Sequence, residues 1–125
     1  MILGLGADLV DAGSVTQELS RGEWQADQGI FTLEEIRYCS TAPNPAPHYA
    51  ACFAAKEAAM KALAVRADDL ALFREVEIVQ GSGSGYKIIL HDRLEAAAEQ
   101  LGVRRIRLSI THAAGQAGAV VILED

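Results

Sequence analysis

A run of alanines in the middle of the chain constrains the fold more than any other feature of the sequence. After Pro47, residues 48–65 predict one long helix. Alanine recurs through this segment, at Ala50, Ala51, Ala54, Ala55, Ala58, Ala59, Ala62 and Ala64. Because these side chains are short, the surface of the helix is nearly smooth and neighbouring elements can approach its backbone closely. The sequence therefore predicts a long central helix against which the remaining elements pack.

Shorter helices are predicted on both sides of the central one. Residues 14–19 indicate a short helix near the N-terminus. Thr32 is a suitable cap for a second helix that continues to about Cys39, with two glutamates in its first turn. Asp92 is expected to cap a third helix, which Gly102 ends.

The remaining segments predict strands and loops. Residues 21–29 are expected to be irregular, with Trp24 as their apolar anchor, and the proline-rich residues 41–47 form a loop. Strands are predicted over residues 1–10, 73–80, 86–90, 105–111 and 117–123, with turns at 81–85 and 113–116. Short connections favour antiparallel pairing. The prediction is an α+β fold in a single domain, residues 1–125, in which one antiparallel sheet packs against the long helix and the shorter helices.

Composition excludes several classes of function. A net charge of −6 argues against nonspecific binding of nucleic acid and against a polybasic membrane contact. No apolar run is long enough to span a bilayer, and the first residues lack the basic region of a signal peptide. Cys39 and Cys52 have no metal-binding spacing, so both are expected to be reduced thiols of a cytoplasmic protein.

Asp8 is the first candidate for chemistry, because it is a carboxylate within an otherwise apolar strand that is expected to be buried. Gly4 and Gly6 are predicted to share its face of the strand and to leave open space beside it. Such a carboxylate is costly to bury unless it is paired, hydrogen-bonded or bound to a metal. A metal ligand is one interpretation. The other is an aspartate at the end of a strand that caps a turn with Ser14 or a backbone amide.

Glu57 and Lys61 are the second candidate, four residues apart on the central helix. Their order is the favoured one for an exposed ion pair along a helix, worth about 0.3–0.5 kcal/mol. The alternative is a partly buried pair that serves a ligand, because Phe53 and several alanines lie on the same stripe. Together with Asp8, these groups suit a divalent metal and a phosphate-bearing ligand. Lys56 is expected to lie at a solvent-facing edge of the helix.

Ser109, Thr111 and His112 form a third candidate at the end of a predicted strand. Hydroxyls and an imidazole at such a position can bind phosphate or accept a proton. A lone histidine is, however, more often a core or turn residue. The neighbouring arginines, at positions 104, 105 and 107, are most simply a solvated strand face.

Three segments taken together resemble the bacterial holo-[acyl-carrier-protein] synthases, the short class of 4′-phosphopantetheinyl transferases. Residues 2–10 are similar to the opening strand of that family, which carries a metal-binding aspartate. The segment Phe53–Ala58 is close to a literal match to the family's central helix motif, and residues 61–63 continue it. Residues 109–112 and 117–124 are similar to its C-terminal hairpin. Chain length and element order agree as well, so the resemblance covers the whole chain.

The resemblance implies a 4′-phosphopantetheinyl transferase-like fold and a magnesium-dependent transfer. In that reaction the 4′-phosphopantetheine group of coenzyme A moves to a serine of an apo acyl carrier protein, and adenosine 3′,5′-bisphosphate is released. By position, Asp8 and Glu57 would be the metal ligands and Lys61 would neutralise phosphate charge. Glu57 or a metal-bound water would help to remove the serine proton.

The same resemblance implies a binding site for the coenzyme and a set of partners. Lys61, Ser109, Thr111 and His112 would contact coenzyme A, with His112 near its phosphates. The expected partners are coenzyme A and an acyl carrier protein. The expected assembly is a homotrimer with the coenzyme between protomers, active in fatty acid biosynthesis.

The chain also departs from the family pattern at binding positions. Cys52 stands where the family commonly has an arginine, and a thiol cannot replace a bidentate donor. Ala113 replaces a residue that is often polar, and residues 11–15 lack an arginine that usually helps to dock the carrier protein. These departures leave open an alternative function, that of a catalytically impaired homologue that binds coenzyme A or serves in assembly.

Overall fold

The computed structural model describes residues 1–22, 29–81, 83 and 85–125, so the expected anchor Trp24 lies outside the described residues. In chain order the elements are β1 (Ile2–Asp11), α1 (Ala12–Arg21), α2 (Leu33–Ser40), α3 (Pro45–Ala62), α4 (Ala71–Arg74), β2 (Val76–Gln80), β3 (Tyr86–Leu90), α5 (Asp92–Leu101), β4 (Arg105–Ala113) and β5 (Gln116–Glu124). The predicted order of helices and strands is therefore present.

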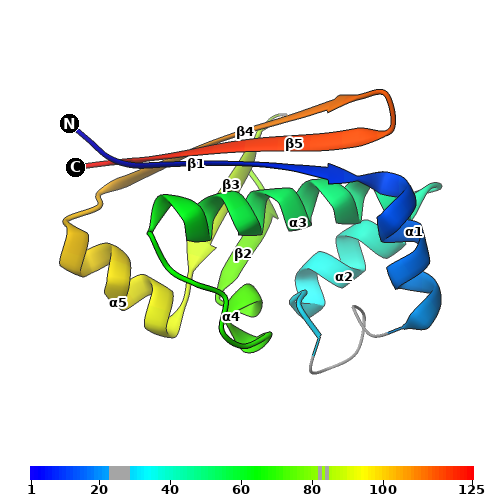
Figure 1. The fold of residues 1–125 in the computed structure, drawn as a ribbon, viewed down its shortest axis with the longest axis horizontal. Coiled ribbons are helices and arrows are strands. Elements are labelled where there is room, and N and C mark those ends of the chain that lie inside the picture. The colour runs from blue at the N-terminus through cyan, green and yellow to red at the C-terminus, as the bar shows by residue number, and fades with distance from the viewer. Residues whose placement is uncertain (23–28, 82, 84) are drawn as a thin grey trace.

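The described strands form two antiparallel sheets rather than the single sheet expected from the sequence. One has three strands in the order β1-β5-β4, and the other is the hairpin of β2 and β3. Helix α3 runs along the three-stranded sheet and contacts all three of its strands, while α2 and β2 contact α3 from the other side (Figure 1). The long helix is thus the middle layer, as its smooth surface predicts.

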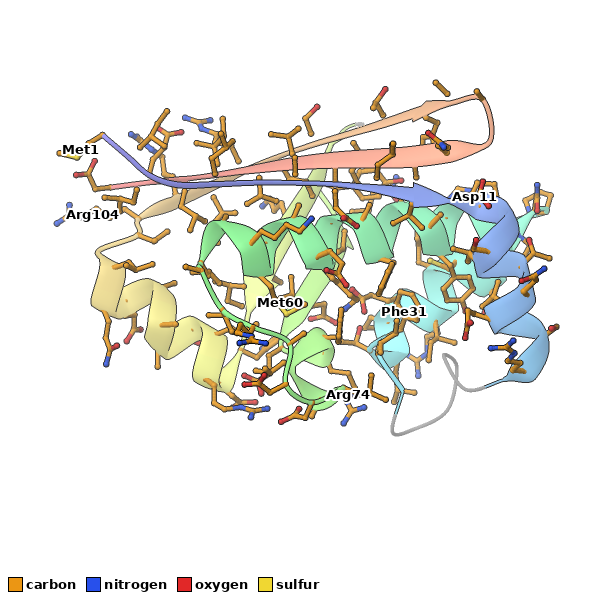
Figure 2. All side chains as sticks on the ribbon, viewed as in Figure 1. Met1, Asp11, Phe31, Met60, Arg74 and Arg104 are labelled. Atoms are coloured by element: carbon orange, nitrogen blue, oxygen red, sulfur yellow. The ribbon has the colours of Figure 1, made fainter. Side chains whose placement is uncertain are left out.

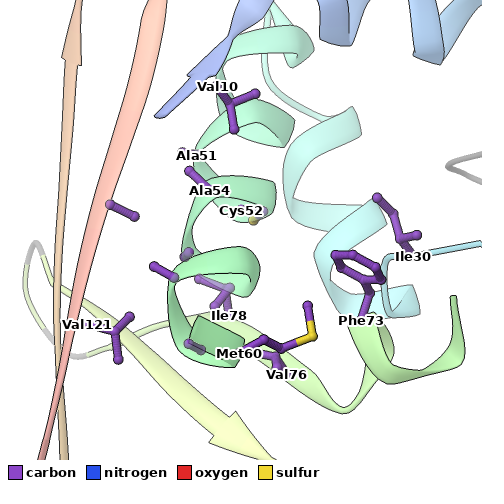
Figure 3. Close-up of a cluster of buried hydrophobic side chains, with 14 of the residues drawn as sticks. Val10, Ile30, Ala51, Cys52, Ala54, Met60, Phe73, Val76, Ile78 and Val121 are labelled. Carbon is purple, nitrogen blue, oxygen red and sulfur yellow. The ribbon is translucent and has the colours of Figure 1, made fainter. Parts of the chain in front are cut away.

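The core around α3 is built largely from small side chains. Ala54, Ala55 and Ala58 have no exposed surface. Figure 3 shows Val121 of the three-stranded sheet on one side of this helix, with Ile78 of the hairpin lying near its C-terminal part. The alanines let both layers approach the helix backbone.

Strand β1 lies directly on α3 because Gly4 and Gly6 have no side chains. A Cβ atom at Gly6 would lie 1.9 Å from the carbonyl oxygen of Ala58, and one at Gly4 would lie 2.2 Å from that of Ala62. The expectation of open space beside Asp8 is therefore wrong, since the backbone of α3 fills that space. The two glycines instead bring the strand, and Asp8 with it, down onto the helix.

Gly6→Ala should lower the free energy of unfolding by about 2–3 kcal/mol, because the added methyl group must push β1 away from α3. Urea denaturation measures this change. Gly85→Ala is the matched control: no atom lies within 4 Å of its added Cβ, so the change there should stay within about 0.5 kcal/mol. Equal effects of the two substitutions would contradict the close packing of β1 on α3.

The second face of β1 differs from the prediction of a buried strand. Leu5 and Leu9 are each 65% exposed, because the three-stranded sheet has α3 on one face and no described element packed over the other. Figure 2 shows side chains projecting from this open face between Met1 at one end of β1 and Asp11 at the other. The apolar sequence of β1 was therefore a misleading sign of burial on both faces.

Several element boundaries also differ from those predicted. Helix α3 begins at Pro45, within the predicted loop, because proline is well tolerated in the first turn of a helix. It ends at Ala62, and Ala64 then takes a positive φ of 57°. The strand predicted from residue 73 begins at Val76, since residues 71–74 form α4. Asp92 is the first residue of α5 rather than its cap.

Lys56 is buried, which corrects its predicted place at a solvent-facing edge. Its side chain has no exposed surface, and its Nζ lies 2.7 Å from a carboxylate oxygen of Glu35. The same ammonium donates to the carbonyl oxygens of Phe73 at 2.8 Å and Val76 at 2.5 Å. Glu35 in turn accepts from the backbone of Thr32, in the predicted cap, and from that of Ile78. This pair ties α2, α4 and β2 to α3.

Candidate functional site

The structure brings Asp8 of β1 to Lys61 of α3. The Nζ atom of Lys61 lies 3.1 Å from Oδ1 of Asp8 and also donates to the carbonyl oxygen of Ala7 at 3.1 Å. Asp8 is mostly buried, with 18% of its side chain exposed, whereas Lys61 is about half exposed. Within the described chain, the ion pair of Lys61 is this one across to the strand, not the predicted pair with Glu57 along the helix.

Glu57 joins the same group of charges from one turn earlier on α3. Burial is the main cause that raises the pKa of Glu57, the negative charge of Asp8 raises it further, and Lys61 acts in the opposite direction. Two carboxylates from elements far apart in the sequence are therefore within electrostatic reach of each other. The sheet and the central helix position them, through the close approach of β1 described above.

The alternative interpretation of Asp8 as a turn cap is wrong. Asp11, not Asp8, accepts the backbone N–H of Ser14 at 3.0 Å and caps α1. Asp8 is consequently left to interact with the charged residues of α3. The backbone carbonyl of Ala7 is a further acceptor at this site that no sequence pattern indicated.

These residues fit a magnesium ion by the chemistry of their donors. Mg²⁺ is commonly held by one or two carboxylates, with waters and substrate phosphates in the other positions. In the described parts of the chain, no group of three or more His, Cys, Asp or Glu side chains could hold a metal ion. The two carboxylates at this place, Asp8 and Glu57, match that number of protein ligands.

Ser109 and Thr111 do not lie with Asp8 in the single chain. Both Thr111 and Leu9 lie within 4 Å of a Cβ built on Gly118, so they share one face of the sheet. Side chains alternate along a strand, so Asp8 points to the opposite face, toward α3. Ser109 is two residues from Thr111 and therefore lies on the open face as well. The structure separates these two hydroxyls from the three charged residues.

His112 lies at the far end of β4 and is exposed. It borders a surface pocket of about 340 Å³, together with Ala12, Pro47 and the turn at residues 113–116. This pocket lies where β1 passes into α1 and where α3 begins. The predicted third candidate thus divides into two hydroxyls on the open face of the sheet and an imidazole at its end.

Comparisons with known proteins agree with this fold. Residues 4–119 match the family model described as ACPS, 4′-phosphopantetheinyl transferase superfamily. The holo-[acyl-carrier-protein] synthase of Koribacter versatilis is 38% identical over 125 residues, which cover all of both chains.

Two solved structures show the same likeness in three dimensions. That of holo-[acyl-carrier-protein] synthase from Neisseria meningitidis has a TM-score of 0.86 at 28% identity and covers all of both chains. That of the Helicobacter pylori enzyme in complex with coenzyme A has a TM-score of 0.79 at 26% identity, covering 96% of this chain and 99% of that one. These neighbours confirm the predicted α+β fold.

The chain therefore belongs to the 4′-phosphopantetheinyl transferase superfamily. Its place there is the holo-[acyl-carrier-protein] synthase family, which confirms the enzyme class predicted from the sequence. None of the helices in the described part of the chain is long and apolar enough to cross a membrane.

Proposed function

We propose that this enzyme transfers the 4′-phosphopantetheine group of coenzyme A to a serine of an apo acyl carrier protein and releases adenosine 3′,5′-bisphosphate. The observation that carries the proposal is the meeting of Asp8, Glu57 and Lys61 between β1 and α3. This group combines two carboxylates with a cation, which suits a metal and a diphosphate. The coenzyme A complex of the Helicobacter pylori relative supports the choice of donor.

In this reaction the serine oxygen forms a bond to the phosphorus that carries the pantetheine arm. The bond from that phosphorus to the oxygen of the departing adenosine 3′,5′-bisphosphate breaks. Glu57, which is half-buried, or a water bound to the metal ion would help to take up the serine proton. Lys61 offsets the negative charge of the phosphates, and its bond to the carbonyl of Ala7 holds it beside Asp8. Positioning and charge neutralisation supply most of the rate in phosphoryl transfer.

Asp8 and Glu57 are also the residues that would hold Mg²⁺. When bound, the ion would supply positive charge to the diphosphate. The mostly buried side chain of Asp8 contacts Lys61, which places the cation beside the proposed metal ligand. Both carboxylates serve the same substrate from opposite elements, β1 and α3.

The open face of the sheet supports the proposal of a homotrimer. Leu5, Leu9 and Val120 are exposed there, and an apolar face of this kind is typical of a surface that contacts another chain. Ser109 and Thr111 lie on the same face, where a neighbouring copy would bring them toward a coenzyme cleft between protomers. We include His112 and Lys61 in that coenzyme site, and a role in fatty acid biosynthesis belongs to the same proposal.

The test is incubation of the protein with coenzyme A, Mg²⁺ and several apo carrier proteins. Mass spectrometry should detect a carrier heavier by one phosphopantetheine group, and chromatography should detect adenosine 3′,5′-bisphosphate in equal amount. Omission of Mg²⁺ should abolish both. Light scattering of the same preparation should give the mass of three chains, and a monomer mass would contradict the trimer.

The departures at Cys52 and Ala113 give this test a second informative outcome. If calorimetry detects binding of coenzyme A while the transfer assay modifies no carrier, the proposed transferase activity is rejected. The protein is then the catalytically impaired homologue. Circular dichroism provides the control that the protein is folded. Absence of both binding and transfer in a folded protein would overturn the proposed substrate.

A further inference from the structure

Helices α2 and α3 contact each other through a series of buried cross-helix pairs. Glu35 of α2 pairs with Lys56 of α3. Cys39, one helical turn after Glu35, faces Cys52, which lies one turn before Lys56. Each step is four residues, so the two helices are antiparallel at this contact. Next to the cysteines, the hydroxyls of Ser40 and Tyr49 lie 2.6 Å apart. The contact is therefore in a fixed register on both sides of the cysteine pair.

The two thiols are held in contact by this register. Their Sγ atoms are 3.8 Å apart, and both residues are buried, with exposed fractions of 0% for Cys39 and 3% for Cys52. A disulfide needs an S–S distance of about 2.05 Å, so the sulfurs must approach by about 1.8 Å. The helices that carry the two cysteines already contact each other.

One residue of the pair, Cys52, borders a surface pocket from which a small reagent can approach it. This pocket has a volume of about 270 Å³, and its lining includes Tyr38, Tyr86 and Glu77. Cys39 does not line this pocket, and it contacts the pocket-lining cysteine from the side of α2. The arrangement places one thiol where a reagent can reach it and a second thiol directly behind it.

We propose that Cys39 and Cys52 form a redox modification site, which a small peroxide converts into a disulfide joining α2 to α3. The sulfur of Cys52, after losing its proton to water, attacks one oxygen of hydrogen peroxide. The O–O bond breaks, and the second oxygen leaves as hydroxide and is protonated to water. The sulfur of Cys39 then attacks that of Cys52, whose S–O bond breaks, and the oxygen and the Cys39 proton leave as a second water. Two thiols are oxidised by two electrons in total, and one peroxide is reduced by two.

The surroundings of the pair slow the reaction of its thiols with an oxidant. The hydrogen bond to Cys39, followed by burial, raises the pKa of Cys52 well above that of an ordinary thiol. The charge of Glu35 raises it further, and Lys56 acts against this. Since the thiolate is the reactive form, the oxidation is slow near neutral pH and is best followed in mildly alkaline buffer.

The experiment is treatment of the full, folded chain with hydrogen peroxide, followed by mass spectrometry and non-reducing electrophoresis. The chain has only two cysteines. A monomer that has lost two hydrogen atoms and both free thiols must therefore carry the Cys39–Cys52 disulfide. Dithiothreitol should restore both thiols. The oxidised chain should also melt higher by on the order of 5 °C, because the disulfide restrains the unfolded chain.

Three results would overturn the proposal. They are uptake of oxygen without a cross-link, disulfide-linked dimers in place of the cross-linked monomer, and retention of both thiols at a peroxide concentration that oxidises the chain in urea. Cys39→Ala and Cys52→Ala are the matched controls, and neither should give the lighter monomer. If a variant fails to fold, the comparison of the native and urea-treated natural chain still decides the question.

Discussion

Lys56→Met should lower the free energy of unfolding by about 3–5 kcal/mol, because it leaves the carboxylate of Glu35 buried without its cation. Glu35 is 1% exposed and lies 2.7 Å from the ammonium. Burial lowers the pKa of Lys56, and the charge of Glu35 opposes that shift. The substitution also leaves the carbonyl oxygens of Phe73 and Val76 without this donor. Urea denaturation followed by circular dichroism measures the loss.

Two controls make this measurement specific for the buried pair. Lys87→Met removes an exposed lysine from the β2–β3 hairpin and should change the free energy of unfolding by no more than about 0.5 kcal/mol. The double variant Glu35→Gln with Lys56→Met should recover part of the loss, since no unpaired charge then remains. A loss below about 1 kcal/mol for Lys56→Met would show that this pair does not hold the layers together.

Glu57→Gln should lower the rate of phosphopantetheine transfer at least about a hundredfold. Glutamine keeps the size of the side chain, yet its neutral amide neither accepts the serine proton well nor supplies the charge that a magnesium ligand needs. The measurement is the initial rate of carrier modification at saturating coenzyme A and Mg²⁺. Because Glu57 is only partly buried, the fold should survive the change.

Glu99→Gln is the matched control for this substitution, because Glu99 is an exposed carboxylate of α5. Its rate should equal that of the natural protein. Thermal unfolding of both variants establishes that any difference in rate is not a difference in folding. An unchanged rate for Glu57→Gln would remove Glu57 from the mechanism, and the proposed site would then need another base.

The central motif shows how far sequence reasoning reaches at this site. Residues 2–10, the segment Phe53–Ala58 with its continuation at 61–63, and the C-terminal residues 109–112 and 117–124 together indicated the family, because residue types and their spacing within a segment are local properties. The prediction placed Lys56 at a solvent-facing edge of the helix and paired the charges of Glu57 and Lys61 with each other. Both details depend on which elements pack against the helix. The pattern of residues along the helix does not identify those elements.

What the sequence determined by itself was the long alanine-rich helix, most other elements, and the candidate metal-binding carboxylates. Only the tertiary structure decided that Gly4 and Gly6 allow β1 to lie directly on α3, that Lys61 pairs with Asp8, and that one face of the sheet stays open. The physical reason is that helix and strand patterns follow from neighbours in the chain. Ion pairs and burial, in contrast, arise between groups that only the packing of distant elements brings into contact.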